Sequence, residues 1–452
     1  MMTRSAVAVV GTLALLAAAG RPAGGQEAAA EAEVLTLEQA LALAVKNSAA
    51  VLSAEAQTIR SEDELAASRT RRYPALEVQA MGSKLLTTPQ VTFPAGAFGV
   101  YPGTGPIPGT DTVVKAQTGP TAWIIGSVAQ PLSTLHKAAL GVKASELARD
   151  SDRQQLRQQK AQVAHDVRRL YYAALQARGS AEAARDQVKA LRQMDEEVRH
   201  YVALETALAS EGMEVKARLA AGEYQIVTYD NALASCKEQL NVLFGRDPRT
   251  PFELVPLSAA SLEEVDVEAA RARALERRPE LEQSRLQVEL ADTQRRLKKA
   301  ELIPEISLAL TYNSFFNVDL LPQNVVQLGL QIKWEPFDWG RRRKELASKT
   351  LAVDQARLAA RDERNRVIAD VDQAFRQVQQ ARALVTARRL GNESAQERVR
   401  VALLRGRAQA ALLREVLQAQ ADAAQARADY DEAQLSLWQA RAELEKAVGE
   451  DM

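Results

Sequence analysis

Few residues of this chain have the types and spacing that chemistry requires. The 452 residues include three histidines, His136, His165 and His200, and one cysteine, Cys236. Zinc is held by His, Cys and acidic ligands at characteristic spacings, and no His/Cys/Asp spacing in the chain matches such a site. No nucleophile elbow, phosphate-binding loop or dinucleotide fingerprint occurs either. We therefore expect a protein that is not an enzyme, with no catalytic residues, no metal and no cofactor.

These side chains have structural interpretations instead. His165 and His200 lie in helical patterns, where positions on the surface or in a helix seam account for them. Cys236, in "NALASCKEQLNVLF", is interpreted as a small packed residue, and as the only cysteine it cannot form a disulfide within one chain. Acidic and basic residues three and four apart, as in "ARDERNR" (360–366), are typical of solvated helix faces.

The first 25 residues predict a secretory signal peptide. Arg4 is followed by an apolar run at 6–19 and then by "RPAGGQ", which favours cleavage near Gly25. The run is shorter than the roughly 20 residues that a membrane-spanning helix needs. We therefore expect an exported mature chain without a transmembrane helix.

The composition favours long helices. Ala, Leu, Arg, Glu and Gln are abundant, and two long spans, 132–247 and 337–452, contain no proline. Heptad spacing of Val, Leu and Ala predicts close helix packing within both spans, from Val163 to Leu191 and from Val367 to Val385. Gly212 and Gly406 are the predicted turns of two helical hairpins. The formal net charge is zero, so no basic excess favours nucleic acid.

The chain contains an internal repeat. "LEQALALAVKNSAAVLSAEAQ" (37–57) aligns with "VEAARARALERRPELEQSRLQ" (267–287), and at the same offset Pro74 matches Pro304. We divide the chain into a signal peptide (1–25), a first repeat (26–262) and a second repeat (263–452). Each repeat consists of a helix, a strand pair (74–131 or 304–336) and a helical hairpin (132–246 or 341–450), with a linker closing the first.

The strand pairs are predicted from alternation of apolar and polar residues. Residues 326–334 and 306–312 alternate with period two, 76–80 do so more weakly, and "TAWIIGSVAQ" (121–130) is the least regular. Runs of about ten residues suit strands that cross a bilayer at a tilt. Open sheet edges are not tolerated in lipid, so a chain with four such strands must oligomerise if they span a membrane.

In its repeated plan and motifs, the chain resembles the TolC-like outer-membrane efflux proteins. The resemblance is carried by "LTLEQALALAVKNS" (35–48), the strand starts "YPALEV" and "IPEISL", "WEPFDWGRRR" (334–343) and "LNVLFGRD" (240–247), arranged in a duplicated plan. It implies a mostly α-helical fold with a small β part. Three chains would form a tunnel of long helical hairpins, and four strands from each would complete a shared twelve-stranded barrel in outer-membrane lipid.

The resemblance also implies a function. The trimer would conduct substrate passively from the periplasm, as the outer-membrane channel of a tripartite efflux or type I secretion system. Its partners would be a periplasmic adaptor protein and an inner-membrane transporter. Drugs, metals and polypeptides all leave cells through tunnels of this kind. The alternative from the residues alone is a periplasmic coiled-coil spacer or adaptor without a channel, which leaves the alternating segments unexplained.

The family's acidic tunnel entrance aligns with Glu214 and Glu415, and a further acidic position of the family is Gln418 here. Carboxylates repeated by threefold symmetry would attract cations and raise one another's pKa. The alternative is that both are solvated residues near a helix N-terminus. Both hairpin turns depart from the family's spacing.

"WEPFDWGRRR" is interpreted as the elbow between barrel and tunnel. Trp334 would anchor at the bilayer interface, Pro336 would end the strand, and Gly340 would adopt an unusual backbone angle. Pro131 is the counterpart of Pro336 in the first repeat. Because positive charge is unfavourable at a helix start, Arg341 to Arg343 are expected to pair with carboxylates or lipid phosphate.

Overall fold

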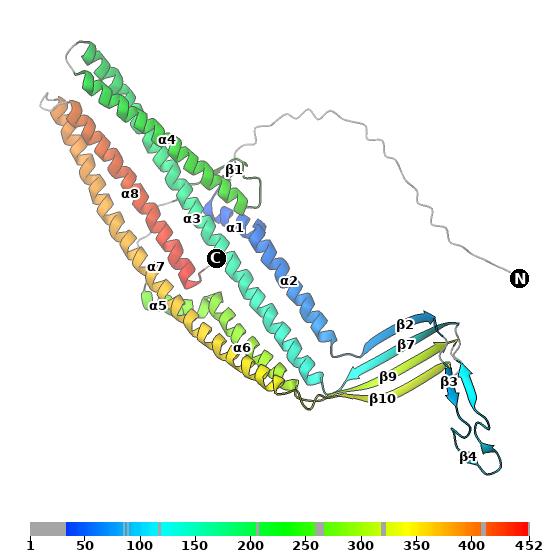
Figure 1. Ribbon diagram of the computed structural model, residues 1–452. Helices are drawn as coiled ribbons and strands as arrows, with labels where there is room; N and C mark the ends of the chain where they lie inside the picture. The colour runs from blue at the N-terminus through cyan, green and yellow to red at the C-terminus, as the bar shows by residue number, and fades with distance from the viewer. Residues whose placement is uncertain are drawn as a thin grey trace, which may run out of the picture.

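The fold is elongated, with a long helical part at one end and a sheet at the other (Figure 1). The computed structural model describes residues 33–84, 86–87, 90–115, 119–204, 208–257, 266–317, 322–407 and 413–450. The predicted signal peptide lies outside these residues. The helices are α1 (Leu37–Asn47), α2 (Ala49–Thr70), α3 (Leu135–Ala203), α4 (Ala209–Leu243), α5 (Val267–Arg277), α6 (Pro279–Ala300), α7 (Arg341–Arg407) and α8 (Leu413–Val448).

The two proline-free spans form the longest helices. α3 has 69 residues and α7 has 67, so each is about 100 Å long at 1.5 Å per residue. The predicted heptad positions Val167, Ala174, Val371 and Val378 are buried, because α4 packs along α3 and α8 packs along α7. No helix in the described part of the chain is long and apolar enough to cross a membrane.

The helices lie side by side in a wall. Towards the hairpin tips α3 lies between α4 and α8, and towards the sheet it lies between α2 and α6 (Figure 1). α7 packs against α8, α6 and α5, and α1 to α4 do not pack along it. The two edges of the wall are therefore α2 with α4, and α7.

The four alternating segments form one antiparallel sheet in the order β10-β9-β7-β2. The least regular segment is confirmed as a full strand, β7. The strands of this sheet are β2 (Ala75–Lys84), β7 (Pro120–Pro131), β9 (Glu305–Phe316) and β10 (Asn324–Lys333). β2 and β10 are its outer strands, so in a single chain the outer edge of each has no partner strand in this sheet.

Several elements were not predicted. Two short antiparallel pairs form a hairpin extension between β2 and β7, and one parallel pair lies at mid-length of the helical part. Their strands are β1 (Glu33–Leu35), β3 (Gln90–Phe93), β4 (Val100–Tyr101), β5 (Gly105–Pro106), β6 (Thr112–Lys115) and β8 (Phe252–Leu254). The first helix of each repeat is also broken in two, at Ser48 and at Arg278, whose extended backbone cannot continue a helix.

Candidate functional site

One face of the sheet is apolar on all four strands. Antiparallel register places Leu328 opposite Leu310, and Leu310 opposite Val128, so these side chains share a face. Other members of this apolar sheet face are Leu76, Val78, Ile124, Ile306, Leu308, Tyr312, Val326, Leu330 and Ile332. No other element among the described residues covers this face: Leu76 is 73% exposed and Leu328 is 70% exposed.

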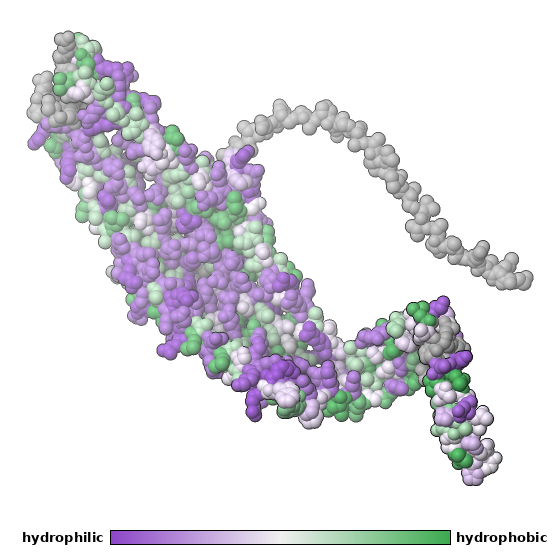
Figure 2. All heavy atoms as spheres, viewed as in Figure 1, coloured by the Kyte–Doolittle hydropathy of each residue, from purple (hydrophilic) through white to green (hydrophobic). Residues whose placement is uncertain are grey.

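The opposite face is largely polar. Gln327 pairs with Thr311, Thr311 with Ser127, and Ser127 with Glu77 across the four strands. A contiguous uncovered apolar face marks a surface that meets lipid or another protein. An apolar face backed by a polar one is the pattern of strands that line a water-filled barrel in a membrane. Figure 2 shows the contrast with the helices, whose visible surface is mostly hydrophilic.

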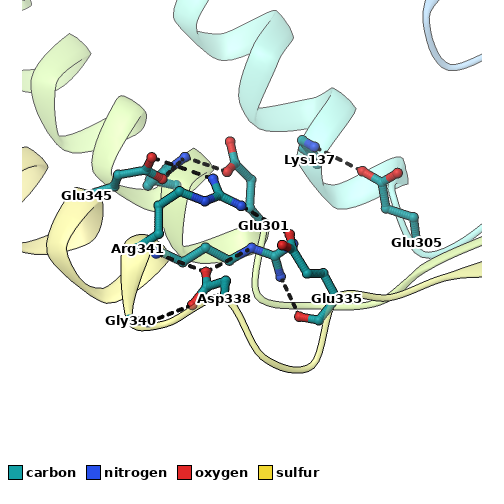
Figure 3. A network of polar contacts seen from close by, with 10 residues as sticks. Lys137, Glu301, Glu305, Glu335, Asp338, Gly340, Arg341 and Glu345 are labelled. Atoms are coloured by element: carbon teal, nitrogen blue, oxygen red, sulfur yellow. Dashed lines mark hydrogen bonds and ion pairs between the residues drawn. The ribbon is translucent and has the colours of Figure 1, made fainter.

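The elbow between β10 and α7 is organised by one carboxylate (Figure 3). The Oδ1 atom of Asp338 accepts from the backbone N–H of Gly340 at 3.1 Å, and its Oδ2 atom accepts from that of Arg342 at 3.0 Å. Asp338 therefore caps α7, and these backbone donors, that of Arg342 first, lower the pKa of its carboxyl group. Asp338 is not among the residues predicted for the elbow, although an Asp just before a helix start is a known capping signal.

Two of the three elbow arginines pair with carboxylates, as predicted. Glu335 contacts both of them, at 3.0 Å from Arg341 and 2.8 Å from Arg342. Arg341 also approaches Glu345 at 3.6 Å. Arg343 is exposed and forms no ion pair with any described residue.

The predicted elbow residues lie where the chain changes direction. Gly340 has a φ of 82°, the left-handed conformation that glycine tolerates best, and Trp339 before it has a φ of 56°. Trp334 and Pro336 lie between β10 and α7, whereas Pro131 is still paired with Ser307 as the last residue of β7. The elbow's exposed aromatic side chains are Trp334, Phe337 and Trp339.

Further ion pairs join the elbow to the neighbouring helices. Lys298 of α6 contacts Glu301 at 2.6 Å and Glu345 of α7 at 2.7 Å. Lys137 of α3 contacts Glu305 of β9 at 3.1 Å (Figure 3). The start of α7 is therefore held to the end of α6, and the start of α3 to the sheet.

The predicted entrance residues lie near the hairpin tips. Glu214 is exposed in the second turn of α4 and forms an ion pair with Arg218 at 2.6 Å. Glu415 is exposed in the first turn of α8, and exposed Gln418 donates to Asp422 at 2.8 Å.

The two predicted turn glycines lie inside helices. Gly212 is the fourth residue of α4, and Gly406 is the next-to-last residue of α7. A Cβ atom at Gly212 would lie 3.9 Å from the side chains of Val198 and Val202, so this glycine faces the packing partner α3. α3 ends at Ala203, before Gly212, and α7 ends at Arg407, one residue after Gly406.

The histidines and the cysteine lie apart from one another. His165 is buried between α3 and α8, with Nε2 3.2 Å from Glu443, and lines a cavity of about 720 Å³ beside Gln373 of α7. His200 is exposed, and Cys236 is half-buried against the core with its thiol pKa raised by burial. In the described ranges, no three His, Cys, Asp or Glu side chains are placed to hold a metal ion.

Comparison with known proteins supports the resemblance. Residues 270–450 match the family model described as outer membrane efflux protein. The sequence as a whole matches no curated protein significantly.

Solved structures of outer-membrane channels share the fold. The Campylobacter jejuni CmeC channel is 14% identical with a TM-score of 0.76; the match covers 91% of this chain and 85% of that one. The Vibrio cholerae outer membrane protein VceC is 14% identical with a TM-score of 0.73, covering 91% and 96%. A membrane protein from Pseudomonas aeruginosa is 15% identical with a TM-score of 0.76, covering 91% and 90%. The predicted resemblance to TolC-like outer-membrane efflux proteins is thereby confirmed.

Proposed function

We propose that three copies of this chain form the outer-membrane channel of a tripartite efflux or type I secretion system. The channel conducts substrate passively from the periplasm, or from an inner-membrane transporter, to the exterior. A periplasmic adaptor protein joins it to that transporter. The chain itself makes and breaks no bond.

The observation that carries this proposal is the uncovered apolar sheet face. The apolar side chains of all four strands point one way, and the polar side chains of Gln327, Thr311 and Ser127 point the other way. Lipid would contact the apolar face, and water in the lumen of the barrel would contact the polar face. A periplasmic spacer without a channel would leave the apolar face in water.

The trimer follows from the two open edges of the sheet. Unpaired backbone groups are costly in lipid, so the outer edges of β2 and β10 need partners. When β2 of one copy pairs with β10 of the next, three copies close a ring of twelve strands and leave no edge. The helical wall is then repeated three times around the same axis and forms a tunnel. Its two edges, α2 with α4 on one side and α7 on the other, meet between neighbouring copies.

The proposal is tested with the purified mature protein in detergent. The expected particle contains three chains and forms discrete, cation-preferring pores in planar bilayers. A protein that is soluble without detergent and forms no pores would refute the proposal. Deleting the gene should sensitise the producing cell to at least one class of exported compound.

A further inference from the structure

We propose that the periplasmic rim of the sheet binds the phosphate groups of anionic phospholipids. The binding surface consists of Arg71 and Arg72 of one copy and Arg343 and Lys344 of the next, which we call the rim cations. This inference rests on the proposed trimer in the outer membrane. It assigns a class of lipid to a surface that does not line the proposed conducting pathway.

The rim cations are exposed positive charges that the elbow's ion pairs leave unpaired. Arg341 and Arg342 both pair with Glu335. Lys298 pairs with both Glu301 and Glu345. All four rim cations are exposed, and none forms an ion pair with any residue that the structure describes. The carboxylates of the elbow are therefore already in ion pairs, and the four rim cations add positive charge to the rim.

The fold places the two pairs of rim cations at the same level of the molecule. Arg71 and Arg72 lie between the end of α2 and the start of β2. Arg343 and Lys344 lie in the first turn of α7, just after the elbow that follows β10. Because β2 and β10 are the outer strands, closure of the trimer brings the two pairs together at each junction between copies.

Exposed aromatic side chains lie among the rim cations. Tyr73 is 69% exposed, and Trp339 is 89% exposed. Trp334, which directly follows the end of β10, is 60% exposed. Tyrosine and tryptophan with this exposure are characteristic of the headgroup level of a bilayer, where the ring is partly in lipid and its polar group is in water.

The charge of the rim cations determines which class of lipid they would bind. Four cations at each junction, with no free carboxylate among the described residues of the elbow, favour a headgroup with net negative charge over a zwitterionic one. The N-terminus of α7 is not needed for this binding, since Asp338 already caps it. The phosphate of a phospholipid, whose acyl chains lie against the apolar sheet face, fits both features.

The test titrates the purified full-length trimer in neutral detergent with phosphatidylglycerol and, in parallel, with phosphatidylcholine. Native mass spectrometry counts the bound lipids. The wild type is expected to prefer phosphatidylglycerol, and replacing all four rim cations (R71Q, R72Q, R343Q and K344Q) should weaken its binding by about tenfold or more. The two double variants, R71Q/R72Q and R343Q/K344Q, should each lose part of the preference, which keeps the test valid if the quadruple variant does not fold.

The matched control is R361Q/R364Q. Both arginines are exposed on α7 without an ion pair to any described residue. They lie about 27 Å or more along the helix from Arg343, beyond the reach of a bilayer that ends at the elbow. Their replacement should leave lipid binding unchanged.

Three results would overturn the inference: equal binding of both lipids, unchanged binding by the rim variants, or an equal loss in the control. Competition by millimolar inorganic phosphate that removes the bound phosphatidylglycerol would also overturn it, in favour of a site for free phosphate. A chain that forms no trimer would refute the proposed function instead, whereas a trimer without lipid preference refutes only this inference.

Discussion

The hydroxyl oxygen of Tyr171 lies 2.7 Å from the carbonyl oxygen of Val255, and it lies 3.1 Å from the carbonyl oxygen of Leu35 as well. Tyr171 is fully buried in the middle of α3. The two carbonyl groups belong to residues at the ends of the paired strands β1 and β8. One side chain thus ties segments from the start and the middle of the sequence to the longest helix.

Tyr171→Phe should lower the free energy of unfolding by about 1–3 kcal/mol, because it removes the hydroxyl donor of the Val255 carbonyl group in a buried place, whereas the Leu35 carbonyl group still accepts from the backbone N–H of Val255. The measurement is thermal unfolding of the detergent-solubilised protein. Tyr172→Phe is the matched control: its ring packs 6.1 Å from that of Trp438, and its hydroxyl forms no hydrogen bond with a described residue. Equal losses in the two variants would contradict this account.

Leu328→Arg should prevent membrane insertion. A cation in the middle of a lipid-facing strand costs about 2–4 kcal/mol per chain, and three copies carry it. Gln327→Arg, one residue earlier and on the opposite face, should insert normally. The yield of detergent-extracted trimer from outer membranes distinguishes the two. If both variants insert equally, the apolar sheet face does not contact lipid.

Alanine substitutions at Gly340 and at Gly391 should have opposite effects on thermal stability. At Gly340 a Cβ atom meets nothing within 4 Å, but the positive φ disfavours any L-residue by about 1–2 kcal/mol. At Gly391, inside α7, the Cβ atom also meets nothing within 4 Å, and alanine should stabilise the helix by up to about 1 kcal/mol. We expect Gly340→Ala to lower the melting temperature and Gly391→Ala to raise it.

Gly340→Val should lower the yield of inserted trimer as well, because a β-branched residue tolerates the left-handed conformation poorly. An unchanged yield would count against the elbow as a requirement for assembly.

His165 should make the protein less stable in mild acid. Burial lowers the pKa of its imidazole, against the opposing effect of Glu443. The unfolded chain then binds the proton more readily than the folded one, so stability is lost as the pH falls below about 6.5 towards the lower folded pKa. His165→Gln should flatten the pH dependence of the melting temperature between about pH 7 and 5.

His200→Gln is the control for this prediction, because His200 is an exposed residue of the same helix. Its pH profile should match that of the wild type. A wild-type profile that is already flat in this range would show that the charge on His165 does not affect folding.

Replacing Glu214 and Glu415 by glutamine should weaken the cation preference of the pore. Three copies of each carboxylate at a constriction attract cations, and the double variant removes six charges from the trimer. The measurement is the reversal potential in a salt gradient. Glu276→Gln, on exposed surface of α5 away from the tips, is the control. An unchanged reversal potential would identify both residues as solvated helix-end residues.

Helices and main strands could be predicted because their signals are local. Absence of proline and heptad spacing predicted α3 and α7, and period-two alternation predicted β9 and β10. The parallel pair β1–β8 has three residues per strand, too few for a period to appear, and its pairing joins positions far apart in the sequence. The break at Arg278 did have a signal, because Pro279 disfavours a helical residue before it.

The candidate site was predicted unevenly for the same reason. Gly340 and its neighbouring arginines could be predicted, because glycine and charge at a helix start have direct physical consequences. Gly212 could not be assigned, since a glycine inside a helix resembles a turn signal unless the packed partner is known. At Gly222, similarly, an added Cβ atom would lie 2.7 Å from the side chain of Val188 across the hairpin. Such close approach between helices depends on tertiary packing.

α3 and α7 have nearly equal lengths, 69 and 67 residues, so the helical part of the chain has a fixed length. Neither helix is interrupted between elbow and tip, so the distance from the sheet to the hairpin tips is set by residue number. Adding one heptad, about 10 Å, to α3 alone would put its tip out of step with α7. A longer helical part therefore requires matched insertions in all four helices of the two hairpins.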